Sequence, residues 1–324
     1  MKTLVVILAL NLGAFAQLPL GKVSDVVPVS CDAGFAPGAT CHSATVSCPN
    51  LPDIGVTWAD VGFIREGRIV VIGGNGGTVP AGGAFAPTYT KAGFQETQIV
   101  FSTDWEYGDD DILAAACRPA TIMDYLHSGT GAAYCAQGDS AGSGAIGYGL
   151  AWYGLSDELD NVEFTVGPVF SNISMGCKVP YAPAVSVIPT DGEPFDDDPQ
   201  YNIEYADMSK WTGTACLPGG GSSPEDLDKE AAQSIIQAGA SLSYPSTNIA
   251  AWDCNNGLNP SAAQSYLFLQ QVTTPWTLTS ISGCTGAEGT STGVTPQGIP
   301  AETATANDMI AHCIRRREKP RIQP

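Results

Sequence analysis

Histidine and basic residues are scarce in this sequence. Its 324 residues include only three histidines, His42, His127 and His312, and 14 lysines and arginines against 33 acidic residues. The formal charge of −19 argues against nucleic acid as a partner, because an acidic surface is repelled by the phosphate backbone. Five basic residues crowd the last ten positions, which predicts a solvated, disordered tail over 315–324. A tail trimmed by a protease and a clamp on the acidic surface are the alternatives.

Patterns for metal binding and for crossing a membrane are also missing. No C-x-x-C pair occurs and no histidine stands at a zinc-ligand spacing, so we expect neither a metal nor another cofactor. The apolar run from Leu4 to Phe15 is shorter than the roughly 20 residues that a membrane-spanning helix needs. Lys2 precedes this run, and the small Ala14 and Ala16 flank Phe15 at its end. This layout predicts a secretory signal peptide over 1–16 and a mature chain from Gln17. A buried N-terminal helix, the alternative, would lack a cap and a polar face.

The ten cysteines all follow the predicted cleavage point. An even number of cysteines in an exported chain indicates disulfides, whose connectivity the sequence leaves open. Loss of Lys2 with the signal peptide leaves 13 basic residues against 33 acidic ones, a formal charge of −20. The remaining chain is long enough for one catalytic domain with insertions over 17–314.

Short apolar runs rich in β-branched residues alternate with helical patterns. Residues 17–60, which are rich in glycine, proline and cysteine, predict an edge of the sheet that is fastened by disulfides. Residues 109–126 predict a helical stretch, and the aspartates at its start are better suited to capping the helix than to binding a metal. Pro-rich and Gly-rich residues 171–224 predict a cap insertion carrying a glycosylation acceptor, Asn172. The pattern predicts an α/β fold with a mainly parallel sheet flanked by helices. The expected strands are 68–74, 97–105, 132–137, 162–170, 248–252 and 276–282.

One motif carries chemistry. Gly138-Asp139-Ser140-Ala141-Gly142 lies between an expected strand and an expected helix. A serine on such a sharp turn needs glycines beside it, because side chains there would collide. The motif therefore predicts a nucleophile elbow with Ser140 at its tip; an ordinary glycine-rich turn is the alternative.

This GDSAG string after a strand resembles the α/β-hydrolase superfamily, in particular esterases related to hormone-sensitive lipase. The resemblance implies a serine nucleophile, an acid after a later strand, a histidine after the last strand and an oxyanion hole before the elbow. On this sequence it points to Ser140, to Asp253 after the strand 248–252, and to the amides of Gly74, Asn75 and Ala141. Asp191 and Glu288 are weaker candidates for the acid. The histidine that leads the relatives' glycine motif is absent here.

The general base is the open question. His312 is the only histidine after Ser140, so elimination makes it the candidate base. It lies at the end of an expected helix, and the alternative is a residue that interacts with the terminal carbonyls. We expect a secreted serine hydrolase that cleaves carboxylic esters of an extracellular polymer or lipid. The alternative is a non-catalytic relative that keeps the fold and binds a carbohydrate, lipid or protein.

The secreted protein should begin at Gln17, and after denaturation it should contain no free thiol that reacts with a thiol reagent. Each bridge should stabilise the fold by about 2 to 4 kcal/mol, mainly by restricting the unfolded chain. N-terminal sequencing and thiol titration in denaturant measure both. Four or more reactive thiols would contradict the disulfide prediction.

Overall fold

The computed structural model describes residues 17–108, 110–127, 131–177, 212–214, 222–255, 261–284 and 293–314. The expected signal peptide and basic tail lie outside these residues, as do most of the expected cap, Asp191 and Glu288.

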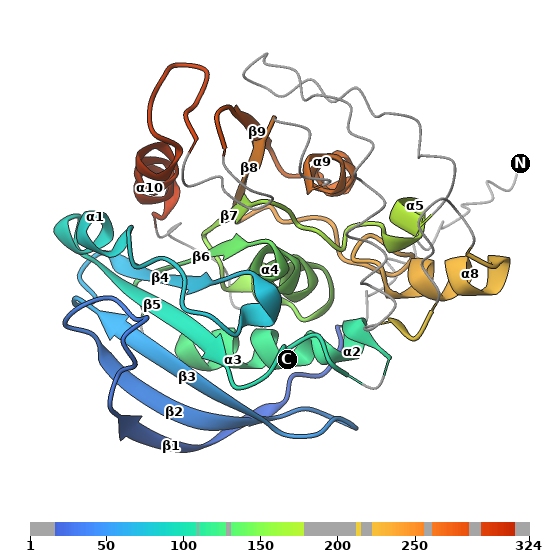
Figure 1. Ribbon diagram of the computed structural model, residues 1–324, viewed down its shortest axis with the longest axis horizontal. Coiled ribbons are helices and arrows are strands. Elements are labelled where there is room, and N and C mark those ends of the chain that lie inside the picture. The colour runs from blue at the N-terminus through green and yellow to red at the C-terminus, as the bar shows by residue number, and fades with distance from the viewer. Residues whose placement is uncertain are drawn as a thin grey trace, which may run out of the picture.

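Nine strands of the described chain form one twisted sheet (Figure 1). Their order is β1-β2-β3-β5-β4-β6-β7-β8-β9. All neighbours from β5 to β9 are parallel, whereas β1, β2 and β3 form an antiparallel end. The expected mainly parallel sheet is confirmed. The strands are β1 (Lys22–Val29), β2 (Thr40–Ser47), β3 (Ile54–Val61), β4 (Gly67–Ile72), β5 (Phe94–Phe101), β6 (Ala133–Asp139), β7 (Asn161–Thr165), β8 (Asn248–Cys254) and β9 (Trp276–Ile281).

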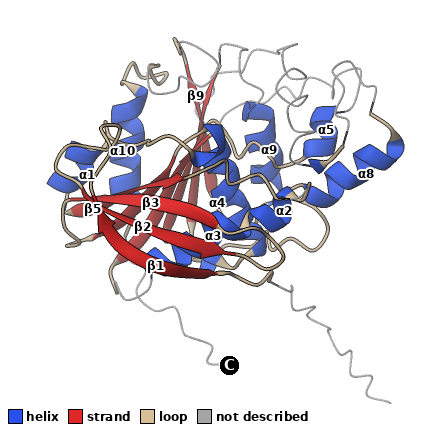
Figure 2. Ribbon diagram, turned by 60° about the horizontal axis from the view of Figure 1, so that its bottom comes forward, coloured by secondary structure: helices blue, strands red, loops and turns tan. Residues whose placement is uncertain are grey.

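Helices cover both faces of the sheet because parallel neighbours require crossover connections (Figure 2). The α1 and α10 helices pack on one face, where Tyr89 and Met309 join Ile69 and Val71 in a buried cluster. The α3, α4 and α9 helices pack in the larger core of the opposite face. The helices are α1 (Ala86–Lys91), α2 (Ile112–Ala115), α3 (Cys117–His127), α4 (Ala141–Trp152), α5 (Ile173–Cys177), α8 (Pro224–Gln233), α9 (Ser261–Gln271) and α10 (Ala301–His312), with 3-10 turns η1 (Asn75–Gly77) and η2 (Leu155–Asp157).

Local sequence explains several element ends. The Asp111 carboxylate accepts a hydrogen bond from the Ala114 amide at 2.9 Å, which caps α2 as expected from the aspartate run. The strand expected over 162–170 ends at Thr165 instead. Val166 follows with a φ of 59°, which lies outside the β region, so the chain turns there.

Disulfides fasten the antiparallel end and the last helix. Described bridges join Cys31 to Cys41, Cys48 to Cys117, Cys135 to Cys313 and Cys254 to Cys284. The first two tie the β1–β2 region to itself and to the start of α3, as expected of a stapled edge. No described cysteine is free.

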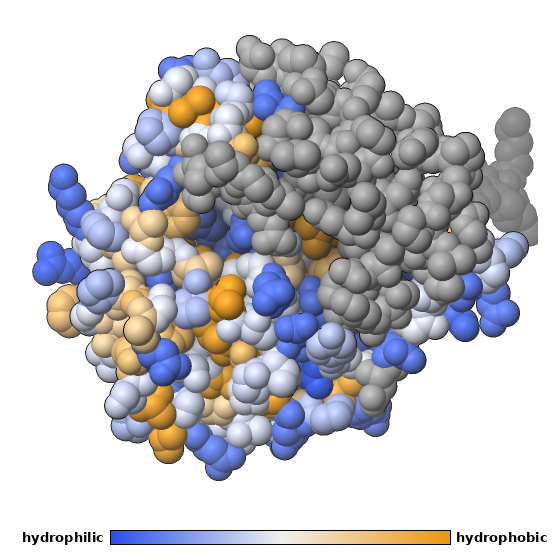
Figure 3. Space-filling view, viewed as in Figure 1, coloured by the Kyte–Doolittle hydropathy of each residue, from blue (hydrophilic) through white to orange (hydrophobic). Residues whose placement is uncertain are grey.

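The outer edge strand β1 is exposed along most of its length. It carries Val26, Val27 and Val29 on the surface, but a bulge between Ser24 and Val27 and the proline at position 28 hinder pairing with another chain. On the face drawn in Figure 3, apolar residues are interspersed with hydrophilic ones.

Acidic side chains are buried on the face that α1 and α10 cover. Glu96 of β5 and Glu163 of β7 are fully buried, and Gln98 Nε2 donates to Glu96 Oε1 at 2.8 Å. Burial raises the pKa of Glu96 to about 8. Burial and the neighbouring Asp308 of α10 raise the pKa of Glu163 well above its usual value. Both carboxyl groups are therefore protonated in the folded protein at mildly acidic pH.

The stability of the protein should fall as pH rises from about 4.5 to about 8. A carboxyl group whose pKa is raised by folding binds its proton more tightly in the folded state. A rise in pH therefore favours the unfolded chain, which gives up this proton more easily. Glu96→Gln should remove up to about 1.4 kcal/mol per pH unit from this slope and leave the protein more stable than wild type at pH 8. Urea unfolding between pH 5 and pH 8 measures the slope.

The exposed Glu66 provides the matched control, since Glu66→Gln makes the same chemical replacement of a carboxyl group at the surface. Parallel slopes for wild type and Glu96→Gln would contradict the buried, protonated state of Glu96.

Candidate active site

Ser140 stands between the last residue of β6 and the first residue of α4. Its φ of 48° and ψ of −114° lie in a region that residues other than glycine seldom occupy, and such strain costs about 1 to 3 kcal/mol. Ser140 is half-buried, and its side chain makes no capping hydrogen bond to α4. The described geometry is that of a sharp strand-to-helix turn with a serine at its tip.

Backbone hydrogen bonds hold Ser140 on both sides. Its amide donates to the Thr165 carbonyl at 3.0 Å, and its carbonyl accepts from the Gly144 amide at 3.1 Å. The first bond fixes the turn to the end of β7, and the second begins α4. Rotation of either peptide group would break one of these bonds, which maintains the strained φ and ψ.

The glycines of the motif allow close contact with neighbouring backbone. A Cβ atom on Gly142 would lie 2.0 Å from the Ile72 carbonyl oxygen, and one on Gly138 would lie 2.5 Å from the Ser143 amide nitrogen. Ala141, Ala145 and Gly149 recur every four residues, which predicts one face of α4 with almost no side chains. The whole helix is buried, however, and Gly144 makes room for Phe170 on another side. Gly142 thus brings the start of α4 against the end of β4.

The glycine loop after β4 consequently lies beside the elbow. Gly74 precedes η1 and Asn75 begins it, while α4 contacts η1 and Gly142 approaches the Gly73 carbonyl. Asn75, Gly76 and Gly77 all have positive φ, and the Gly76 carbonyl accepts from the Trp105 amide at 3.0 Å. The structure therefore brings together the two segments that carry the three predicted oxyanion amides, those of Gly74, Asn75 and Ala141.

Asp253 occupies the same edge of the sheet. It is fully buried near the end of β8, next to Trp252, whose carbonyl accepts from the Val166 amide at 3.0 Å. Only β7 separates β6 from β8, so Asp253 lies about 10 Å from the Ser140 position across the sheet, at the usual spacing of strands. A direct hydrogen bond between the two side chains does not span this distance. An intermediate group would have to connect them.

His312 lies at the opposite edge. Its carbonyl accepts from Asn248 Nδ2 at 3.4 Å where β8 begins, and Cys313 is bridged to Cys135 near the start of β6. The α10 helix starts with Ala301 on the Ser140 side, and eleven residues later His312 lies about 16 Å along the axis. The structure therefore does not bring the predicted base, His312, to Ser140.

The imidazole of His312 is instead occupied within its own helix. Its Nδ1 lies 3.2 Å from the Asp308 carboxylate and 3.1 Å from the Asp308 carbonyl oxygen. These contacts agree with the alternative sequence interpretation, a residue at a helix end that interacts with the last carbonyls.

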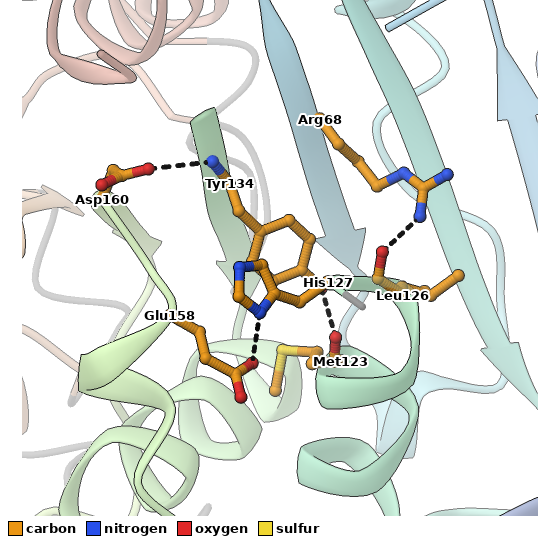
Figure 4. Close-up of polar contacts among 7 residues, drawn as sticks. All are labelled: Arg68, Met123, Leu126, His127, Tyr134, Glu158 and Asp160. Carbon is orange, nitrogen blue, oxygen red and sulfur yellow. Dashed lines mark hydrogen bonds and ion pairs between the residues drawn. The ribbon is translucent and has the colours of Figure 1, made fainter. Parts of the chain in front are cut away.

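The two other histidines are also distant from the elbow. His127, the last residue of α3, lies against the Tyr134 ring, and its Nδ1 is 3.4 Å from Glu158 Oε2 (Figure 4). Tyr134 is near the start of β6, at the opposite end of that strand from Ser140. His42 of β2 stacks on Trp58 with ring centroids 5.3 Å apart. Because the sequence contains only three histidines, none supplies the predicted Ser-His pair.

A small pocket of about 240 Å³ borders the elbow on the face that α1 and α10 cover. Asp139 and Glu302 supply acidic groups to its wall, and Thr165 of β7 lies between the pocket and the elbow backbone. Its described lining is Val71, Ala81, Gly82, Ala84, Phe85, Gln137, Asp139, Thr165, Ala301, Glu302 and Thr305. No sequence motif identifies Thr165, because it is one residue of a buried strand.

Comparison with known proteins defines the fold. No family model and no curated protein sequence matches this chain. Among solved structures, a lipase in an open form has a TM-score of 0.54 at 12% identity, covering 85% of this chain and 100% of that chain. A dienelactone hydrolase from Anabaena variabilis has a TM-score of 0.46 at 13% identity, covering 85% and 96%. Est1E from Butyrivibrio proteoclasticus has 0.43 at 13%, covering 89% and 99%.

The strand order and the flanking helices are those of the α/β-hydrolase fold, and this chain has that fold. The expectation of an α/β-hydrolase-like architecture is confirmed, whereas identities this low say nothing of the reaction.

Gly142→Ala should destabilise the protein by about 2 to 4 kcal/mol. The added methyl group would overlap the Ile72 carbonyl, and backbone cannot move aside as a flexible side chain can. Urea unfolding measures the loss. Gly83→Ala is the control, because its nearest neighbour would lie at 3.5 Å, an ordinary contact distance. Equal stability of the two variants would contradict the close approach of α4 to β4.

Proposed function

We propose that this protein is a serine hydrolase that cleaves carboxylic esters, with Ser140 as the nucleophile. The observation that carries the proposal is the strained turn at Ser140, since backbone strain of this kind persists where the surroundings maintain it and is concentrated at active sites. The GDSAG motif and the partial exposure of Ser140 support the same assignment.

In the proposed reaction the Ser140 hydroxyl oxygen attacks the ester carbonyl carbon. The bond from that carbon to the alcohol oxygen then breaks, and the alcohol leaves after taking a proton from water. Water hydrolyses the resulting acyl-enzyme, which releases the carboxylic acid and restores the Ser140 hydroxyl. The amides of Gly74, Asn75 and Ala141 would donate hydrogen bonds to the oxyanion. Asp253 would be the acid of the site. The Ser140 hydroxyl must lose its proton during attack, and the three histidines contact other groups. We therefore propose that the proton passes to hydroxide from the solvent, which becomes water, and that histidine is not the base.

This arrangement has a kinetic consequence. A serine hydroxyl without an imidazole is a weak nucleophile, although an oxyanion hole and substrate binding alone leave about 10³ to 10⁴-fold acceleration over water. We therefore expect slow turnover, with a rate that rises with pH and shows no inflection near 6.5, where histidine titrates.

A second candidate function is binding without catalysis. The observation that favours it is the location of His312 beside Asn248, away from the elbow. A chain that keeps the fold without a base could bind a carbohydrate, a lipid or a protein partner through the same edge of the sheet.

Secretion and an extracellular substrate are part of the proposal. The four described disulfides are compatible with an oxidising compartment, and the Leu18 amide donates to the Trp152 carbonyl at 2.7 Å, which anchors the chain just after the predicted cleavage point. None of the described helices is long and apolar enough to span a bilayer. The ester would belong to an extracellular polymer or a lipid, and Asn172 would carry a glycan.

Ser140→Ala should abolish hydrolysis of p-nitrophenyl esters and labelling by a serine-directed phosphonate while the melting temperature stays near that of wild type. Loss of the nucleophile removes acyl-enzyme formation, but α4 keeps its first hydrogen bond because that bond uses the backbone. Short and long acyl chains should be compared to find the preferred substrate.

His312→Gln is the matched control and should retain wild-type turnover. Full activity of Ser140→Ala would overturn the nucleophile assignment, and a large loss in His312→Gln would restore histidine as the base. If wild type neither hydrolyses esters nor reacts with the phosphonate, the binding function is favoured.

A further inference from the structure

We propose that Thr165, the last residue of β7, is a positioning residue for Ser140 and acts with the help of Ser143. The inference rests on the proposed function, because it concerns how the same serine is held for attack. Thr165 lies outside the GDSAG motif and follows no pattern that marks an active site.

The Thr165 hydroxyl contacts the two residues that precede Ser140. Its Oγ1 lies 3.0 Å from the Gly138 carbonyl oxygen and 3.0 Å from Asp139 Oδ1, and its single proton can bond one of them at a time. The Ser143 hydroxyl lies 2.7 Å from the same Gly138 oxygen and 2.9 Å from the Thr165 carbonyl oxygen. Both side chains are buried.

The backbone of Thr165 forms a hydrogen bond with Ser140 itself. Its carbonyl accepts the Ser140 amide at 3.0 Å, so Thr165 contacts each of residues 138, 139 and 140. The next residue, Val166, donates its amide to the Trp252 carbonyl, directly before Asp253. The Thr165–Val166 pair therefore joins the turn that carries the nucleophile to the strand end that carries the acid.

The hydroxyl matters because Ser140 has a strained conformation. A residue with this φ and ψ relaxes unless neighbouring groups fix the peptides around it, and the Gly138 carbonyl oxygen lies within hydrogen-bond distance of two hydroxyl groups. Displacement of a reacting atom by about 1 Å can lower a rate by about a hundredfold. Loss of the Thr165 hydroxyl should therefore slow acylation, while substrate affinity changes little.

Thr165→Val removes the hydroxyl at nearly constant volume, and Thr165→Ser keeps it. Thr247→Val is the matched control: Thr247 is fully buried at the start of β8, and its Oγ1 donates to the Leu159 carbonyl at 2.8 Å, far from the elbow. For each variant the phosphonate labelling rate, kcat, KM and Tm are compared with wild type.

We expect both valine variants to lose a similar amount of Tm. Only Thr165→Val should label and turn over about tenfold to a hundredfold more slowly, with KM within about twofold of wild type, and Thr165→Ser should recover most of the rate. An unchanged labelling rate in Thr165→Val, or equal slowing in Thr247→Val, would overturn the inference.

Failure of the proposed function would be recognised separately. If wild type is neither labelled nor active, crystal structures of wild type and Thr165→Val decide the positioning role. A Ser140 φ that leaves the positive region in the variant supports it, and an unchanged Ser140 overturns it.

Discussion

The hydrogen bond from the Ser140 amide to the Thr165 carbonyl is the interaction on which the site depends. It fixes a strained serine to the neighbouring strand, and the bond from Val166 to Trp252 extends the connection to β8. Parallel strands bring their carboxyl ends to one edge, but only such cross-connections set the relative positions of the residues that follow them. The rigid sheet and the fully buried α4 provide the support that keeps the strained turn from relaxing.

A disulfide at the end of α10 determines where the His312 side chain lies. The bridge between Cys135 and Cys313 fastens the end of α10 to the start of β6, at the edge opposite Ser140. His312 precedes that bridge by one residue and is therefore held at the same edge, where it contacts Asp308. A histidine base would instead have to follow β9 directly, in the chain before α10 begins. The helix carries the only available imidazole away from the site.

The face that α1 and α10 cover has an unusual polar character for a core. Glu96 and Glu163 lie among apolar side chains without a basic partner among the described residues, and Tyr89 donates to Gln137 at 2.7 Å between them. Such acids are tolerated because they stay protonated and can then donate as well as accept hydrogen bonds. The pocket beside Asp139 lies on the same face.

Apolar periodicity and glycine placement are local signals, so the layered α/β fold, the turn at Ser140 and all six parallel strands, to within about five residues, can be predicted from the sequence. The sequence also predicts Asp253 near the end of a later strand, and it lies at the Ser140 edge because parallel strands end at one edge of the sheet. The location of His312 depends on the tertiary structure, because a helix of 12 residues and a disulfide between residues 178 positions apart set its distance from Ser140. The same holds for Thr165, whose contacts with 138–140 arise from strand pairing and leave no mark in the local sequence.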